Sequence, residues 1–173
     1  MRLFFAIRLP DEAREKLRAV AAAMGCAKIE QLHFTLAFLG ETPRADDACA
    51  AAGEVRGAPF DVGIAGAGAF PSPARPRVLW LGVGDGAQPM VAVADALCAA
   101  LRARGFPLEE RPFHPHLTVT RVKPGGDRSA QRLLTRVPAG ELARFRVAEF
   151  CLMQSVLGAG GAKHSLVRAF PLC

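Results

Sequence analysis

Two short motifs place a histidine and a threonine two residues apart in apolar segments. The first is His33 with Thr35 in LHFTLAFLG, and the second is His116 with Thr118 in HPHLTVTRV. Side chains alternate along a strand, so each pair projects from one face. A single histidine in such a segment is more often a hydrogen-bonded core residue than a catalyst. The recurrence of the pattern at two of the four histidines favours a functional pair instead.

Two imidazoles that face one site can divide proton transfer near neutral pH, one of them neutral and the other protonated. The hydroxyls of Thr35 and Thr118 can donate hydrogen bonds to non-bridging phosphate oxygens. The chemistry that fits is in-line displacement at phosphorus, in which one histidine activates a nucleophile and the other protonates the leaving oxygen. No carboxylate cluster accompanies the motifs, so we expect neither a metal ion nor a cofactor.

The composition narrows the class of protein and its partners. A chain of 173 residues with 51% hydrophobic and 22% charged residues is typical of one globular domain. Its formal net charge is +6, from 22 Lys and Arg against 16 Asp and Glu, which favours an anionic partner such as RNA or a phosphate ester. The apolar run Leu3–Ile7 is too short for a signal sequence, and no stretch has the length of a membrane helix. We therefore expect no membrane association.

Five cysteines are scattered along the chain, without a C-x-x-C pair or the spacing of zinc ligands. This pattern indicates reduced thiols and a cytoplasmic protein. The cysteines are Cys26, Cys49, Cys98, Cys151 and Cys173.

The chain carries one order of elements twice, and the two histidine motifs fall at equivalent strands. His116 follows His33 by 83 residues, and other landmarks are separated by 75 to 85 residues, as a duplication with small insertions would leave. The first half is predicted to contain strands at 2–9, 33–40 and 60–64 and helices at 11–25 and 45–55. The second half is predicted to contain strands at 77–84, 114–122, 145–156 and 164–170 and helices at 89–105 and 128–136.

This repetition predicts an α/β (α+β) fold with two lobes related by a pseudo-twofold axis. We expect two largely antiparallel sheets that flank a central cleft, with the helices outside. The chain would form a single domain over residues 1–173, with lobe-like repeats at about 1–70 and 75–173. Such an axis would bring both imidazoles to one cleft.

The motifs and their flanks resemble a known family. HFTLAFLG and RPFHPHLTVTR are similar to the paired H-x-T-x motifs of the 2H phosphoesterase superfamily, and above all to the bacterial RNA 2′,3′-cyclic phosphodiesterases, also called the 2′-5′ RNA ligase family. The opening RLFFAIRLP, the middle GAFPSPARPRVLWLGV and the closing LVRAFPL extend the resemblance over nearly the whole chain. It implies metal-independent hydrolysis of RNA 2′,3′-cyclic phosphate ends to 2′-phosphates.

The resemblance also implies a role for each matching residue. His33 falls at the proton donor to the leaving ribose oxygen, and His116 at the proton acceptor that activates water. Thr35 and Thr118 fall at the phosphate-holding threonines, and Arg121 at an arginine that would contact phosphate or ribose. The C-terminal segment departs from the family, because His164 stands where relatives often have an aromatic residue. The chain has no Tyr, so Trp80 and the phenylalanines are the candidates for nucleobase stacking.

Two other functions stay open from the sequence. One is 2′-5′ RNA ligation or 2′-5′ phosphodiester cleavage, in which a ribose hydroxyl takes the place of water. The other is non-catalytic binding of RNA ends, although a phosphate clamp would be served better by Arg or Lys than by two H-x-T pairs. The expected partner is RNA with a 2′,3′-cyclic phosphate end or a cyclic nucleotide, and the expected state is a monomer.

Overall fold

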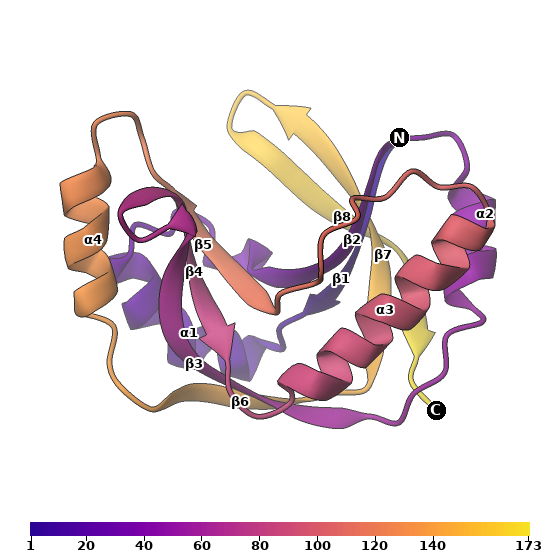
Figure 1. Ribbon diagram of the computed structural model, residues 1–173, viewed down its shortest axis with the longest axis horizontal. Helices are drawn as coiled ribbons and strands as arrows, with labels where there is room; N and C mark the ends of the chain where they lie inside the picture. The colour runs from indigo at the N-terminus through magenta and orange to yellow at the C-terminus, as the bar shows by residue number, and fades with distance from the viewer.

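A single antiparallel sheet forms the centre of the protein. The computed structural model describes residues 1–173 and places eight strands in the order β6-β3-β4-β5-β2-β1-β7-β8 (Figure 1). The strands are β1 (Arg2–Arg8), β2 (His33–Glu41), β3 (Phe60–Ser72), β4 (Arg75–Val83), β5 (His116–Arg121), β6 (Glu141–Val147), β7 (Glu149–Gly158) and β8 (Gly161–Pro171). The helices are α1 (Asp11–Ala23), α2 (Ala45–Ala52), α3 (Ala87–Ala103) and α4 (Asp127–Thr135), with a 3-10 turn at Ile29–Gln31.

The prediction of two separate sheets is wrong, because β2 and β5 join the two halves into one. They pair antiparallel, with Phe34 opposite Leu117. On either side of this junction the order is β5-β4-β3-β6 and β2-β1-β7-β8, so the two H-x-T strands occupy equivalent central positions. Each half of the sheet also contains a strand from the other half of the sequence. The strand β3, from the first half, pairs with β4, and β7, from the second half, pairs with β1.

The sheet has one face packed on the helices and one face that carries the polar motifs. In β1, the side chains of Leu3, Phe5 and Ile7 are buried in the main core with residues from all four helices. The alternate residues Phe4 and Ala6 belong to a separate cluster on the other face. Full burial of each large apolar side chain contributes about 1.5–3 kcal/mol, so a one-residue slip of β1 would be strongly unfavourable. The register that aims Phe4 and Ala6 away from the helices is therefore fixed.

Helix α1 begins at the predicted residue, Asp11, and ends at Ala23, two residues before the predicted end. Pro10 precedes it with a φ of −67°, and Asp11 and Glu12 lie in the first turn, where acidic side chains interact favourably with the helix dipole. Just beyond the helix, Gly25 has a φ of 85°, a backbone conformation that residues with a Cβ rarely adopt. The turn brings the Gly25 carbonyl to β5, where it accepts a hydrogen bond of 3.2 Å from the Thr120 hydroxyl.

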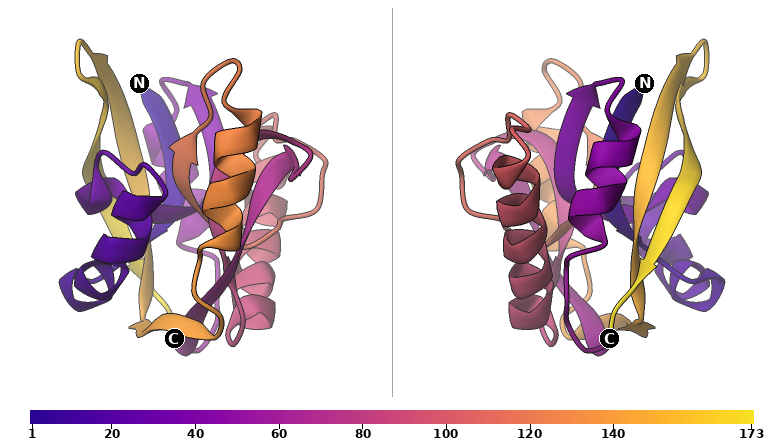
Figure 2. Two further views of the ribbon diagram at one scale, coloured as in Figure 1. Left: turned by 90° about the vertical axis from the view of Figure 1, so that its left-hand side faces the viewer. Right: turned by 90° about the vertical axis from the view of Figure 1, so that its right-hand side faces the viewer.

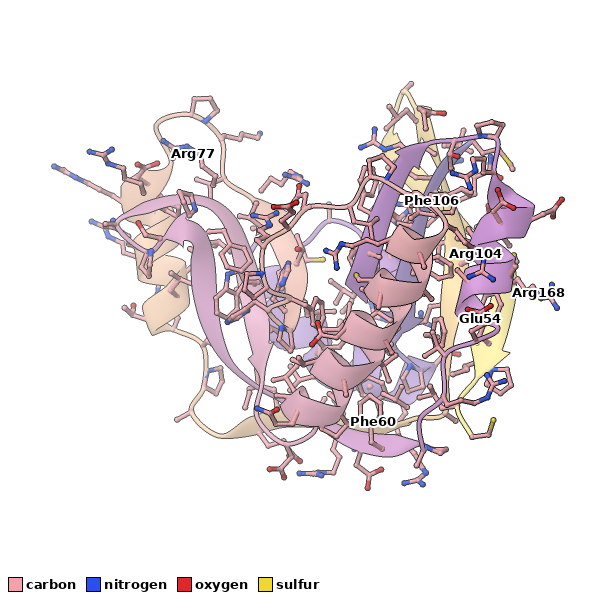
Figure 3. The ribbon with its side chains drawn as sticks, turned by 45° about the vertical axis from the view of Figure 1, so that its right-hand side comes forward. Glu54, Phe60, Arg77, Arg104, Phe106 and Arg168 are labelled. Atoms are coloured by element: carbon pink, nitrogen blue, oxygen red, sulfur yellow. The ribbon has the colours of Figure 1, made fainter.

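Helices α2 and α3 lie together at one end of the molecule, and α4 lies at the other (Figures 1 and 2). At the end of α3, Arg104 forms a two-pronged ion pair with Glu54, which follows α2, at 2.5 and 3.1 Å (Figure 3). Arg44, just before α2, stacks on the ring of Phe106 at 4.5 Å. These contacts join the two helices through residues at their ends.

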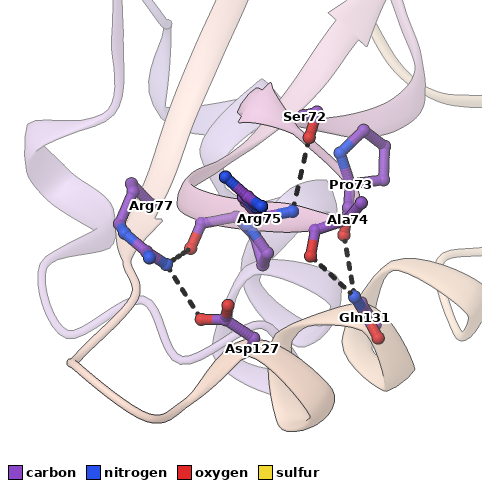
Figure 4. Close-up of polar contacts among 8 residues, drawn as sticks. Ser72, Pro73, Ala74, Arg75, Arg77, Asp127 and Gln131 are labelled. Carbon is purple, nitrogen blue, oxygen red and sulfur yellow. Dashed lines mark hydrogen bonds and ion pairs between the residues drawn. The ribbon is translucent and has the colours of Figure 1, made fainter.

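Polar contacts hold α4 against the β3–β4 hairpin (Figure 4). The Arg77 guanidinium of β4 pairs with the Asp127 carboxylate at 2.8 Å. The side-chain amide of Gln131 donates to the carbonyls of Pro73 and Ala74 at 3.1 and 3.2 Å. Arg77 is thus engaged with α4.

Most predicted elements are confirmed, with two clear differences. The strand expected over residues 145–156 is two strands, which break at Ala148 and occupy opposite halves of the sheet. The strand expected at residues 60–64 continues to Ser72. All five cysteines are free thiols. None of the helices combines the length and the apolar character that a membrane crossing requires.

Candidate active site

The two H-x-T pairs meet at the junction of β2 and β5. Because Phe34 lies opposite Leu117 in this antiparallel pair, the register sets His33 opposite Thr118 and Thr35 opposite His116. Phe34 and Leu117 are fully buried in the core, whereas the four flanking residues are half-buried. The two histidine rings are also close enough for His116 to affect the pKa of His33 electrostatically. Two imidazoles and two hydroxyls therefore share one small area on the face away from the helices.

Both histidines are held by the same local hydrogen bond. The Nδ1 atom of His33 lies 2.7 Å from the carbonyl oxygen of Gln31, and that of His116 lies 2.6 Å from the carbonyl oxygen of His114. A carbonyl only accepts, so in each ring Nδ1 carries a proton and donates it. Proton exchange with a substrate then falls to Nε2 in both rings. The two motifs thus present the same nitrogen in the same tautomer.

Burial acts on the protonation of both rings. It lowers the pKa of His33, while the hydrogen bond to Gln31 works in the opposite direction. The nearby rings of His164 and His116 lower the pKa of His33 further. The pKa of His116 is also lowered, first by burial, against the hydrogen bond to the His114 carbonyl. The lowered pKa values favour the neutral form of both imidazoles, and perturbed histidines of this kind are typical of functional sites.

Aromatic rings support His33 from the β1 and β8 side. Its ring centroid lies 5.0 Å from that of Phe4 and 5.1 Å from that of His164, which packs edge-on. Phe4 and His164 also contact each other at 5.0 Å. The Nδ1 atom of His164 is buried without a hydrogen-bond partner. The departure noted in the sequence at His164 therefore lies directly beside the first motif.

A second aromatic group flanks His116. The ring of Phe70 lies edge-on to His116 at 4.8 Å and packs against Trp80 at 5.3 Å, and the His114 ring contacts both. Trp80 lies over Gly68, where an added Cβ would overlap the indole ring. Gly68 thus leaves the space that the indole occupies. The two sides of the site are arranged alike: each has a motif histidine with a further histidine and aromatic rings beside it.

A bulge in β5 decides where Arg121 points. The β4–β5 register runs from Trp80 opposite Thr118 to Leu79 opposite Thr120, so one residue of β5 is extra. Beyond the bulge, Thr120 faces α1, and Arg121 pairs with Val78 on the same face as Trp80. Strict alternation would have aimed Arg121 toward the helices. Arg121 is exposed and has no ion-pair partner, so its charge is available on the site's face.

A pocket of about 250 Å³ opens beside His33 and reaches toward α1 and β8. Its wall includes Arg8, Arg14 and His164. A second pocket, of about 220 Å³, lies between α1 and the region around the end of α4 and is mostly apolar. It contains none of the histidines, so it is separate from the site. No group of three or more His, Cys, Asp or Glu side chains is arranged to hold a metal ion.

Arg8 is the residue near the site that sequence reasoning missed. The β1–β2 register places it opposite His33, which puts its side chain on the face of the two motifs. The alternation of Phe4, Ala6 and Arg8 along RLFFAIR carried this signal. It could be interpreted only with knowledge that β1 pairs with β2 in this register.

Known proteins match the chain over nearly its full length. The family model for the 2′-5′ RNA ligase superfamily matches residues 8–159. An RNA 2′,3′-cyclic phosphodiesterase from Archaeoglobus fulgidus is 32% identical over 98% of this chain and 99% of its own. The enzyme of the same description from Escherichia coli K12 is 31% identical, over 99% of this chain and 96% of its own.

Solved structures agree with this match. Escherichia coli LigT complexed with 3′-AMP superposes with a TM-score of 0.80 at 31% identity, over 99% of this chain and 97% of that one. A protein from Thermus thermophilus gives a TM-score of 0.79 at 29% identity, over 99% of this chain and 98% of that one. With the family model, the curated relatives and the fold in agreement, this chain belongs to the 2′-5′ RNA ligase superfamily and is a homologue of the RNA 2′,3′-cyclic phosphodiesterases.

Proposed function

We propose that this protein hydrolyses 2′,3′-cyclic phosphate ends of RNA to 2′-phosphates. The observation that carries the proposal is the pair of imidazoles on adjacent central strands, each with Nδ1 anchored to the carbonyl two residues upstream. Family membership supports it, since the relatives are described as RNA 2′,3′-cyclic phosphodiesterases. The net charge of +6 suits an RNA substrate.

In the proposed reaction His116 is the base and His33 is the acid. The Nε2 atom of His116 takes a proton from water, whose oxygen attacks phosphorus. The bond from phosphorus to O3′ breaks on the opposite side, and Nε2–H of His33 protonates that oxygen. The phosphate stays on O2′. One proton is taken and one is given, so the pair returns to its starting state after the two rings exchange protons with solvent.

The threonines and Arg121 would hold the phosphate during this step. Thr35 and Thr118 each lie opposite a histidine, so their hydroxyls can donate to the two non-bridging oxygens while His116 acts on the attacking water and His33 on the leaving O3′. The free guanidinium of Arg121 adds positive charge on the same face and can donate to phosphate or ribose. Such a site would contribute to catalysis mainly by holding phosphorus in a fixed position between two proton-transfer groups.

A second candidate is the joining or cleavage of 2′-5′ linkages, which the name of the matching superfamily favours. The chemistry at phosphorus is the same, with a ribose hydroxyl in the place of water. The aromatic group of Phe70, Trp80 and His114 lies on the His116 side, where such a nucleophile would enter. It offers a surface on which a second nucleoside could stack.

The direct test is incubation of a short RNA bearing a 2′,3′-cyclic phosphate with the purified protein in excess EDTA. We expect conversion to a 2′-phosphate at an undiminished rate, since the proposed chemistry needs only the side chains. The end group is identified by its sensitivity to phosphatase and by mass and mobility against 2′- and 3′-phosphate standards. An unchanged cyclic end would defeat the proposed hydrolysis and leave the 2′-5′ linkage chemistry or RNA-end binding. Strict dependence on an added divalent ion would overturn the two-histidine mechanism.

The pH profile of kcat/KM is expected to be bell-shaped, with its optimum below about pH 6.5. The base must be neutral and the acid protonated, so the two limbs report the macroscopic pKa values of the pair. Burial lowers the pKa of both His33 and His116 from 6.5, which moves both limbs to the acid side. In the complex the phosphodiester anion favours imidazolium, so the kcat profile should lie at higher pH than that of kcat/KM. A kcat/KM optimum on the alkaline side of neutrality would contradict this account.

A further inference from the structure

The pocket beside His33 combines positive charge with an apolar wall. Its volume of about 250 Å³ is just below the ~300–1,000 Å³ typical of small-molecule sites, which suits one nucleoside. Arg8 and Arg14 contribute two positive charges against the single carboxylate of Glu30, and Met153 and Leu166 contribute apolar surface. This pocket lies on the face of the two motifs.

Arg14 is already engaged by other groups of the protein, whereas Arg8 is not. Arg14 of α1 pairs with Asp11, and it donates to the backbone carbonyl of Glu30 at 3.4 Å. Arg8 forms no ion pair and no side-chain hydrogen bond, and it is exposed. The β1–β2 register sets it directly opposite His33. Arg8 is therefore an uncommitted guanidinium next to one histidine of the pair, with the anchored Arg14 in the same pocket.

The apolar wall comes from β7, β8 and the ring next to His33. Met153 pairs with Leu166 across these strands, and Leu166 is 48% exposed, so its apolar surface is open to a ligand. The ring of His164 stands edge-on beside His33 and completes the wall. A flexible thioether, a leucine and an imidazole can pack against the face of any base, because none of them reads a Watson–Crick edge.

The geometry of in-line displacement determines which part of the substrate lies on the His33 side of the site. The attacking and leaving oxygens are on opposite sides of phosphorus, so the ribose that bears O3′ lies beside the acid and the water lies beside the base. With His33 as the acid, the terminal nucleoside occupies the His33 side, where the pocket opens. Its 5′ oxygen then continues toward the next phosphodiester of the RNA.

We propose that this pocket is the subsite for the nucleotide that bears the cyclic phosphate, and that Arg8 binds the phosphodiester on its 5′ side. The inference rests on the proposed hydrolysis and on His33 as its acid, and it deepens that function. The preferred substrate class is an RNA end of two or more nucleotides, rather than a nucleoside 2′,3′-cyclic phosphate, with little selection for the base. Arg14 positions the same phosphate from the other wall.

The test compares two substrates that differ by one phosphodiester: adenosine 2′,3′-cyclic phosphate and the dinucleotide ApA ending in a 2′,3′-cyclic phosphate. We measure the ratio of kcat/KM for the dinucleotide to that for the mononucleotide at low salt. In the wild-type protein the ratio should exceed one. In Arg8→Gln it should fall about 10- to 100-fold, the worth of one charge-assisted hydrogen bond, mainly through KM of the dinucleotide.

Arg128→Gln is the matched control, because it removes one positive charge from an exposed arginine that forms no ion pair. Its helix, α4, packs on β4, in the half of the sheet that does not contain β8. We expect its ratio to stay at the wild-type value. An equal fall in both variants would reduce the effect to net charge and overturn the subsite. A ratio unchanged by Arg8→Gln, with both substrates hydrolysed, would overturn the subsite and leave the proposed function standing. Failure of the wild-type protein on both substrates would instead defeat the proposed function, and the subsite with it.

Discussion

His33→Ala and His116→Ala should each lower kcat/KM for an RNA 2′,3′-cyclic phosphate by about 10²–10⁴-fold, the usual worth of one positioned proton-transfer group. Each substitution removes the motif imidazole whose Nε2 is assigned to proton transfer on its side of phosphorus. The loss should appear in kcat and in kcat/KM alike, since proton transfer develops in the transition state. Steady-state rates on the same RNA, with circular dichroism to verify folding, provide the measurement.

His114→Ala is the matched control for these variants. It deletes an imidazole two residues from His116, and with it the ring contacts to Trp80 and Phe70. The backbone carbonyl that holds Nδ1 of His116 remains in place. We therefore expect a loss well below that of His116→Ala. Near-wild-type activity in both His33→Ala and His116→Ala would return the two motif histidines to a purely structural role.

Local patterns predict most of the elements, because hydrophobic period and glycine and proline positions are properties of short segments. Helix α1 shows this, from Asp11 to the turn at Gly25. The continuous strand expected over 145–156 shows the limit. Its residues have strand character throughout, but β6 pairs with β3 and β7 pairs with β1, in opposite halves of the sheet. The break at Ala148 is set by distant partners, which a local pattern does not contain.

The single sheet follows from the same kind of long-range contact. One pair of opposed residues, Phe34 and Leu117, decides whether the halves form two sheets or one. The continuation of β3 to Ser72 was hidden by the glycines and alanines of IAGAGA, which are weak strand formers. Gly68 is present there because Trp80 of the neighbouring strand occupies the space of a side chain.

Part of the candidate site can be predicted from local patterns, and the rest depends on strand pairing between distant segments. His33 and Thr35, like His116 and Thr118, are recognisable because residues two apart on a strand share a face, and the structure brings the four together. The direction of Arg121 depends on a bulge, and no alternation rule could supply it. The proximity of Arg8 to His33 depends on the pairing of two strands that are separated in sequence by the whole of α1.

The central claim is that one histidine of the pair gives a proton to the leaving oxygen and the other takes one from the nucleophile. It is tested most directly with a 3′-deoxynucleoside 2′-(4-nitrophenyl) phosphodiester, whose nitrophenolate leaves without a proton and which has no neighbouring hydroxyl to replace water as the nucleophile. For each variant, the loss of kcat/KM relative to wild type is compared between this diester and the RNA cyclic phosphate. A general acid has nothing to contribute to the activated diester, whereas a general base still has to deprotonate water.

We predict that His33→Ala regains most of its activity on the activated diester, with a recovery of about 10²-fold or more, the size of the lost acid contribution. His116→Ala should stay as impaired as it is on RNA. Recovery of His116→Ala in place of His33→Ala would reverse the two roles and move the terminal nucleoside away from the Arg8 pocket. Equal impairment of both variants on both substrates would contradict the division of labour between His33 and His116.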